Sequence, residues 1–261
     1  MLVLNADDLS FSYDNKTDCI NHVSLSLSSG EMAVILGSNG SGKSTLARLL
    51  SGLASPDSGS VSYYGIKKGE ERQRISIVFQ NPDNQFSEST VTEELGFICR
   101  NFRICDAEEK IVSALRDVGL SGFQKRDPST LSGGEKVRLL LASAIIRDPA
   151  VLILDETFSM LDHSASSACI SLINRLRREK QIAVLLITHN TAEALDSDII
   201  YILEKGRIAE SGIPDGILRN PDILSCYGIS PLPATGFAFS LKRRLSPLPL
   251  TDEELLEAIC S

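Results

Sequence analysis

Gly37-Ser38-Asn39-Gly40-Ser41-Gly42-Lys43-Ser44 matches the pattern G-x-x-x-x-G-K-[ST] of a phosphate-binding loop. An apolar run at residues 32–36 comes before this octapeptide, and Leu46, Leu49 and Leu50 follow it at helical spacing. The octapeptide is therefore predicted to connect a buried strand to a helix, which is the context that the pattern requires.

The loop carries the groups that bind a triphosphate. Its glycines allow backbone N–H groups to point at phosphate oxygens, and the start of the next helix adds partial positive charge. The Lys43 ammonium suits the β and γ phosphates, and the Ser44 hydroxyl suits Mg²⁺. We therefore expect a nucleoside triphosphate with magnesium to bind here.

Further apolar runs predict the rest of an α/β fold. Residues 75–79, 151–154, 183–188 and 199–203 are strand-sized and separated by helical segments, as in a mixed, mostly parallel core sheet. The first thirty residues instead alternate between apolar and polar side chains, which predicts an antiparallel β subdomain with one buried face.

Helical patterns mark two more units. Residues from about 81 to 147 read as a helical insertion, whose helices open at the capping-box pairs Thr90/Glu93 and Asp106/Glu109. Residues 1–220 would then form the main domain. Residues 221–261 would form a small C-terminal extension, with an amphipathic helix capped at residues 251–254.

Two carboxylates follow the apolar run at residues 151–154. Ligands of parallel sheets bind at the carboxyl ends of the strands, where Asp155 and Glu156 are expected to lie. Asp155 is placed to hold the magnesium ion, and Glu156 to polarise or orient an attacking water.

A second anion site is expected at Ser132-Gly133-Gly134-Glu135, which opens another helix. Two glycines at a helix N-terminus expose N–H groups to an anion. Because the inserted helical block separates this site from the phosphate loop, the simplest arrangement is a dimer in which each chain's second site faces the other chain's phosphates.

Composition excludes several classes of protein. The 261 residues carry a formal charge of -8, which argues against a nucleic-acid-coating surface. Apolar runs fall well short of the roughly 20 residues of a membrane span, and the N-terminus does not resemble a signal peptide, so we expect a cytoplasmic protein. The six cysteines show no zinc-site spacing and are expected to be free thiols.

The ordered motifs resemble the nucleotide-binding subunit of ATP-binding cassette (ABC) transporters. The resemblance implies a P-loop NTPase fold with a helical signature subdomain, and hydrolysis of ATP to ADP and phosphate. It implies catalytic roles for Glu156, His189, Gln80 and Lys43, and a Mg²⁺ site at Ser44, Gln80 and Asp155. It also implies that the Walker A loop, here Gly37 to Thr45, and Gln80 contact ATP. The signature Ser132-Gly133-Gly134-Glu135 and Asp162, in the D-loop at residues 159–162, would contact ATP as well. Tyr13 would stack on adenine. Tyr13 could equally be a strand residue facing the core.

One branch of this family fits better than the others. Residues 78–86, followed by Val91 and Glu94, are similar to the ATPases of energy-coupling factor (ECF) importers of vitamins and transition-metal ions. The tail is also similar to the C-terminal extension by which those ATPases pair. The resemblance implies a transmembrane scaffold and a membrane substrate-binding subunit as partners, a homodimer or a heterodimer with a second ABC ATPase, and a peripheral place on the cytoplasmic side of the membrane.

Some positions depart from the common family pattern. Glu135 replaces a frequent Gln, Thr157 and Phe158 follow the catalytic glutamate, and Asn190 stands where an acid is frequent. Residues 95–98 also alter a pattern expected to meet the transmembrane partner. The alternatives are an ordinary ABC importer ATPase, a soluble ABC clamp acting on DNA or ribosomes, and a non-hydrolysing regulatory cassette. The acidic charge weighs against nucleic acid.

Overall fold

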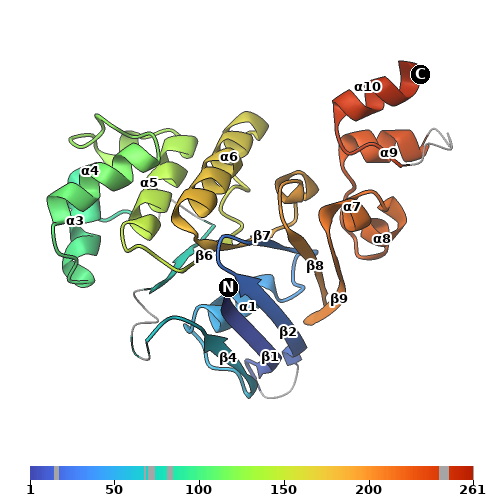
Figure 1. Ribbon diagram of the computed structural model, residues 1–261, viewed down its shortest axis with the longest axis horizontal. Coiled ribbons are helices and arrows are strands. Elements are labelled where there is room, and N and C mark those ends of the chain that lie inside the picture. Colours follow the sequence, from blue (N-terminus) through green and yellow to red (C-terminus); the bar gives the residue numbers. More distant parts are fainter. Residues whose placement is uncertain (15–17, 68, 70–73, 81–84, 241–246, 261) are drawn as a thin grey trace.

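A central sheet, two helical groups and a smaller sheet make up the protein (Figure 1). The smaller sheet lies below the central sheet in this view, a block of helices lies to the left, and the C-terminal helices lie to the upper right. The computed structural model describes all residues except 15–17, 68, 70–73, 81–84, 241–246 and 261.

The central sheet has six strands in the order β5-β6-β7-β3-β8-β9. Every neighbouring pair from β5 to β8 is parallel, and β9 joins the edge antiparallel to β8. The mixed, mostly parallel sheet predicted from the sequence is therefore confirmed. The strands are β3 (Met32–Leu36), β5 (Ile75–Val78), β6 (Val151–Asp155), β7 (Ala183–Thr188), β8 (Ile199–Glu204) and β9 (Arg207–Gly212).

Both faces of the central sheet are buried, which explains why its strands are continuous apolar runs. Val34 of β3 packs on the face covered by the helical block. Its neighbour Ile35 packs on the opposite face, against helix α1 (Lys43–Leu50) and the smaller sheet. Alternation along a strand thus places apolar side chains in two cores, one on each side.

The smaller sheet is antiparallel, with the order β2-β1-β4. It contains β1 (Leu2–Ser12), β2 (Asp18–Ser28) and β4 (Ser58–Tyr63), so the antiparallel subdomain predicted for the first thirty residues gains a third strand from after α1. Leu4, Leu9, Val23 and Leu27 are fully buried on the face toward the central sheet.

Within the described residues of the predicted helical insertion lie α3 (Val91–Asn101), α4 (Ala107–Asp117), the short η2 (Pro128–Thr130) and α5 (Gly133–Ile145). The Thr90 hydroxyl accepts a hydrogen bond from the Glu93 N–H, so that cap is as predicted. The cap predicted at Asp106 is wrong. Asp106 has φ 55°, a left-handed conformation in which its side chain makes no capping hydrogen bond, because capping requires extended backbone.

Two helical segments follow β6 and β7. α6 (His163–Lys180) packs beside α5, and the short η3 (Thr191–Ala194) follows β7. The buried Arg177 of α6 donates to Asp198 at 2.6 Å and to the Gly30 carbonyl at 2.7 Å. These hydrogen bonds tie α6 to the segments that come just before β8 and β3.

The described helices at the end of the chain are α7 (Pro214–Leu218), α8 (Pro221–Cys226), α9 (Pro233–Ser240) and α10 (Asp252–Cys260). Leu218, Leu224 and Leu232 are buried in the main core. The Thr251 hydroxyl caps α10 by accepting from the Glu254 N–H, as the sequence predicted. Among the described helices, none combines the length and the apolar character that a membrane span requires.

Candidate nucleotide-binding and catalytic site

The phosphate loop follows β3 and runs into α1. Gly42, at φ 103°, is in a conformation that favours glycine, and an added Cβ would lie 2.7 Å from the Cys19 carbonyl. An added Cβ at Gly37 would lie 2.5 Å from the Leu203 carbonyl. No side chain caps α1, so the first N–H groups of this helix face the loop, where an anion binds favourably.

Lys43 lies inside this loop with only 5% of its side chain exposed. Its ammonium donates to the carbonyls of Gly37 at 2.8 Å and Ser38 at 2.9 Å, and it lies 3.6 Å from Oε1 of Glu156. Burial lowers the pKa of Lys43, while the Glu156 carboxylate acts in the opposite direction. The cation is therefore held at the loop, with its donors directed inward.

Asp155 ends β6 beside the start of α1. The Ser44 hydroxyl donates to its carboxylate at 3.2 Å, and burial raises the pKa of Asp155 while this hydrogen bond lowers it. A hydroxyl and a buried carboxylate are hard oxygen ligands, and Mg²⁺ commonly takes one or two such protein ligands together with phosphate oxygens and water. The two residues therefore fit a magnesium ion.

Glu156 and His189 come from neighbouring strands. Glu156 directly follows β6 at φ 48°, and its N–H donates to the carbonyl of Ile187 in β7 at 2.9 Å. His189 directly follows β7, and its Nδ1 lies 3.8 Å from Oε1 of Glu156. Lys43, Glu156 and His189 thus meet at the carboxyl edge of the parallel strands, where α/β sheets bind ligands.

Gln80 is linked to Glu156 by hydrogen bonds through Ser159, a residue to which the sequence assigned no role of its own. The Gln80 amide donates to the hydroxyl of Ser159 at 3.3 Å, and that hydroxyl donates to the carbonyl of Glu156 at 2.9 Å. The structure therefore brings Gln80 to the loop after β6. This hydrogen bond is to Ser159 and not to Ser44 or Asp155, so the role of Gln80 as a metal ligand stays a prediction. Residues 81–84, part of the ECF-like segment, lie outside the described residues.

Tyr13 lies beyond the end of β1 and is 62% exposed. Its hydroxyl is hydrogen-bonded to that of Thr45 at 3.3 Å, and the Cys19 thiol donates to the same oxygen at 3.2 Å. The alternative of a core-facing Tyr13 is wrong, because most of the ring is open to solvent beside the phosphate loop. Its stacking on adenine stays a prediction.

The residues Ser132-Gly133-Gly134-Glu135 lie at the start of α5, with Ser132 as the N-cap. Ser132 and Glu135 cap the helix reciprocally, and the Ser132 N–H lowers the pKa of the Glu135 carboxyl. A Cβ added at Gly133 would lie 3.4 Å from Leu161, so this group lies beside residues 159–162. Asp162 caps α6 through the Ala165 N–H.

Comparison with known proteins agrees with this geometry. The ABC transporter family profile matches residues 20–159. The chain belongs to the ABC transporter family. It is 36% identical to the energy-coupling factor transporter ATP-binding protein EcfA of Pediococcus pentosaceus, over 99% of this chain and 97% of that protein. It is 37% identical to the EcfA1 protein of Geobacillus kaustophilus, over 98% of this chain and 96% of that protein.

A solved structure is also similar to this ABC ATPase. The cbiO1 protein of Clostridium perfringens, part of the ABC transporter complex cbiONQ, superposes with a TM-score of 0.80 at 27% identity. The superposition covers 92% of this chain and 99% of that protein. Full-length similarity of this kind places the chain with the ECF transporter ATPases.

The residues that depart from the common ABC pattern have structural partners. The Thr157 hydroxyl donates to the Val78 carbonyl at 3.3 Å. This hydrogen bond joins the segment after β6 to the last residue of β5, two residues before Gln80. Phe158 is fully buried in the main core. The Asn190 amide donates to Glu193 and its oxygen accepts from the Ala192 N–H, so it caps η3.

Proposed function

We propose that this ABC ATPase powers an ECF-type importer of a vitamin or a transition-metal ion. The observation that carries the ATPase activity in this proposal is the meeting of Lys43, Glu156 and His189 beside the Ser44–Asp155 pair; the full-length similarity to EcfA proteins supports the ECF branch. This set provides a cation for the phosphates, ligands for a metal, and an acid–base group for water. A non-hydrolysing cassette would not need the last of these.

Each residue then has a distinct task. Lys43 and the N–H groups of the loop bind the β and γ phosphates, and Tyr13 stacks on the adenine. Ser44 and Asp155 would hold Mg²⁺, with Gln80 as a further ligand, and the bound ion would supply positive charge against the charge that develops on the phosphates. Glu156 orients the attacking water and accepts its proton, and His189 contacts the γ-phosphate.

Two copies of the cassette, or this chain and a related one, sandwich two ATP molecules. Ser132, Gly133, Gly134 and Glu135 lie at the N-terminus of α5, where backbone N–H groups suit the phosphate of a facing cassette. Asp162 lies beside this group and would contact the same nucleotide. In the dimer, each ATP site would combine the phosphate loop of one cassette with residues 132–135 of the other.

The C-terminal extension, residues 221–261, supports the pairing. Among the described residues of the extension, Phe237, Phe239 and Leu256 are large, apolar and exposed. Because exposed apolar side chains can mark interaction sites, we assign them to contact between the two cassettes.

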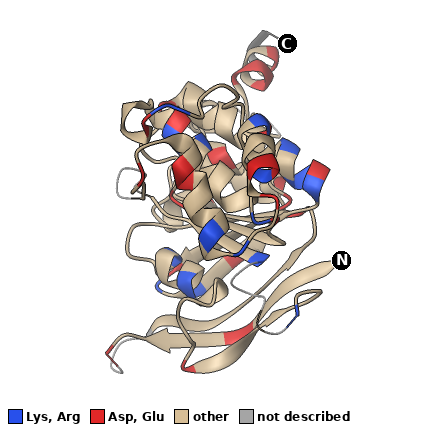
Figure 2. Cartoon of the chain, turned by 90° about the vertical axis from the view of Figure 1, so that its left-hand side faces the viewer, with Lys and Arg blue, Asp and Glu red and all other residues tan. Residues whose placement is uncertain are grey.

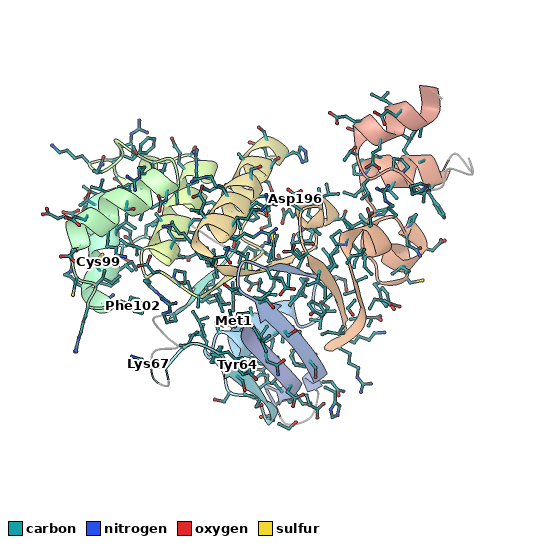
Figure 3. The ribbon with its side chains drawn as sticks, viewed as in Figure 1. Met1, Tyr64, Lys67, Cys99, Phe102 and Asp196 are labelled. Carbon is teal, nitrogen blue, oxygen red and sulfur yellow. The ribbon has the colours of Figure 1, made fainter. Side chains whose placement is uncertain are left out.

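A transmembrane scaffold would dock between the sheet and the helical block. A cavity of about 730 Å³ lies there, and Leu53, Ile77, Phe102 and Arg147 are among the residues that line it. Phe102 lies at the end of the helical block nearest to the sheet (Figure 3). Such a cavity suits an apolar helix end from the scaffold, which would hold the ATPase at the cytoplasmic face of the membrane.

The charge distribution argues against a nucleic-acid partner. Among the residues that the structure describes, basic and acidic residues are interspersed in the view of Figure 2. Because the protein has a formal net charge of -8, it would repel phosphate backbones rather than bind them.

The test is affinity purification of the tagged protein from membranes in mild detergent, with mass spectrometry of the chains that co-purify. We expect a transmembrane scaffold, a small membrane substrate-binding protein and, for a heterodimer, a second cassette. A two-subunit permease with a soluble binding protein would contradict the ECF branch, and ribosomal or DNA-bound partners alone would contradict transport.

A further inference from the structure

Glu193 is a buried glutamate in the segment that follows His189 of the candidate site. It lies in η3, four residues after His189, and only 5% of it is exposed. Burying a carboxylate is costly unless donors surround it. Its Oε1 accepts from the Ser166 hydroxyl at 3.4 Å and from the Asn190 amide at 3.3 Å, and the Thr188 hydroxyl is a further hydrogen-bond partner.

These partners lie on two separate segments that both border the catalytic group. Thr188 and Asn190 are the neighbours of His189 in the chain. Ser166 lies in the first turn of α6, and its N–H donates to the carbonyl of Asp162. One carboxylate therefore ties the loop that carries His189 to α6, the helix that Asp162 caps.

His189 itself depends on this loop for its position. Its side chain is 53% exposed and lines a cavity of about 450 Å³, so the walls around the ring leave it room to turn. The loop backbone is better fixed. The Asn190 N–H donates to the Thr188 hydroxyl at 3.0 Å, and the Thr191 hydroxyl donates to the carbonyl of Ser230 at 3.1 Å.

We propose that Glu193 is a positioning residue, which holds the His189 loop against the first turn of α6 and so keeps His189 within reach of Glu156. The inference rests on the proposed ATPase function, and it assigns Glu193 no contact with ATP. Truncating the carboxylate removes the acceptor for three donors and frees the loop, whereas glutamine keeps an oxygen at the same place.

The experiment compares Glu193→Ala, Glu193→Gln and a control, Asn174→Ala, in the full-length protein. Asn174 is also buried on α6 and hydrogen-bonded, to Asp196, but lies far from the site along the helix. We expect kcat for ATP to fall about tenfold in Glu193→Ala, with KM within about twofold, in line with the coupling seen between residues of one hydrogen-bond network. Glu193→Gln and Asn174→Ala should stay within about threefold of the wild-type kcat.

Imidazole NMR gives a second readout that does not need turnover. The chain has three histidines, so His189→Ala assigns the His189 signal. Glu193→Ala should shift or broaden that signal and leave the signal of the distant His22 unchanged. An unmoved His189 signal, a kcat no lower than in Asn174→Ala, or a glutamine variant as slow as alanine would overturn the inference. A wild-type protein without ATPase activity would instead contradict the proposed function, and the NMR result would still decide the role of Glu193.

Discussion

The Lys43 ammonium and the Glu156 carboxylate lie 3.6 Å apart, although the two residues belong to different strand–loop units. Both side chains are largely shielded from water, so their attraction is weakly screened. The pair therefore fixes the cation of the phosphate loop relative to the group that would orient water.

Replacing Lys43 with alanine should weaken ATP binding. A charge-assisted hydrogen bond is worth about 1.5–3 kcal/mol, so we expect the Kd for ATP to rise by at least about tenfold. Titration calorimetry measures this directly. Lys205→Ala, which removes an exposed lysine, is the control and should leave Kd unchanged. Equal affinities of wild type and Lys43→Ala would argue against the phosphate-loop role.

Gly42→Ala should disturb the loop more than a glycine substitution elsewhere. At φ 103° a side chain is strained, and its Cβ would lie 2.7 Å from the Cys19 carbonyl, so we expect lower stability and weaker ATP binding. The matched control is Gly96→Ala in α3, where alanine is the better helix former and should be neutral or stabilising by up to about 1 kcal/mol. Thermal unfolding with and without ATP distinguishes the two variants. Identical shifts in both would be inconsistent with a constrained loop.

Phe158→Ala should strongly destabilise the fold. Phe158, two residues after Glu156, is fully buried, and removing such a ring costs about 3–5 kcal/mol. Urea unfolding of the isolated subunit measures the loss. Leu53→Ala, at an exposed apolar residue, should change stability by less than about 0.5 kcal/mol. A small effect at Phe158 would mean that the segment after Glu156 does not depend on the core.

Acid should loosen the docking of α10. The Arg219 guanidinium donates to Glu254 at 2.9 Å, and this hydrogen bond lowers the pKa of the Glu254 carboxyl. Because the folded-state pKa is depressed, the stabilisation is present above the ordinary carboxyl value of about 4.3 and is lost as pH falls through the lower folded value. Hydrogen exchange in α10 should therefore accelerate, relative to the rest of the chain, below about pH 4. In Glu254→Gln the same protection should already be lost at neutral pH. Retained protection in that variant would contradict the role of the ion pair.

Sequence patterns predicted the parts of the structure that depend on local or one-dimensional signals. The central strands are apolar because both their faces are buried, and the phosphate loop and the acids after β6 are contiguous motifs. The strands β4 and β9 were not predicted, because their edge positions allow polar residues such as Ser58 and Glu210. The Gln80–Ser159 hydrogen bond could not be predicted either, since it depends on β5 lying next to β6.

Buried polar contacts could not be predicted from the sequence either. Glu193 has no motif that marks it, and its burial follows only from the packing of η3 against α6. The left-handed backbone of Asp106, at φ 55°, likewise has no signal in the sequence, whose side-chain pattern predicted a cap that does not form.

The most direct test of the catalytic assignment is Glu156→Gln, assayed for ATP hydrolysis, ATP binding and dimer formation in one preparation. Loss of a general base typically costs about 10²–10⁴ in rate, so hydrolysis should nearly vanish. ATP binding should persist, because Lys43 and the loop remain, and ATP should hold two cassettes together, as light scattering would detect. Hydrolysis by Glu156→Gln at the wild-type rate would contradict the account.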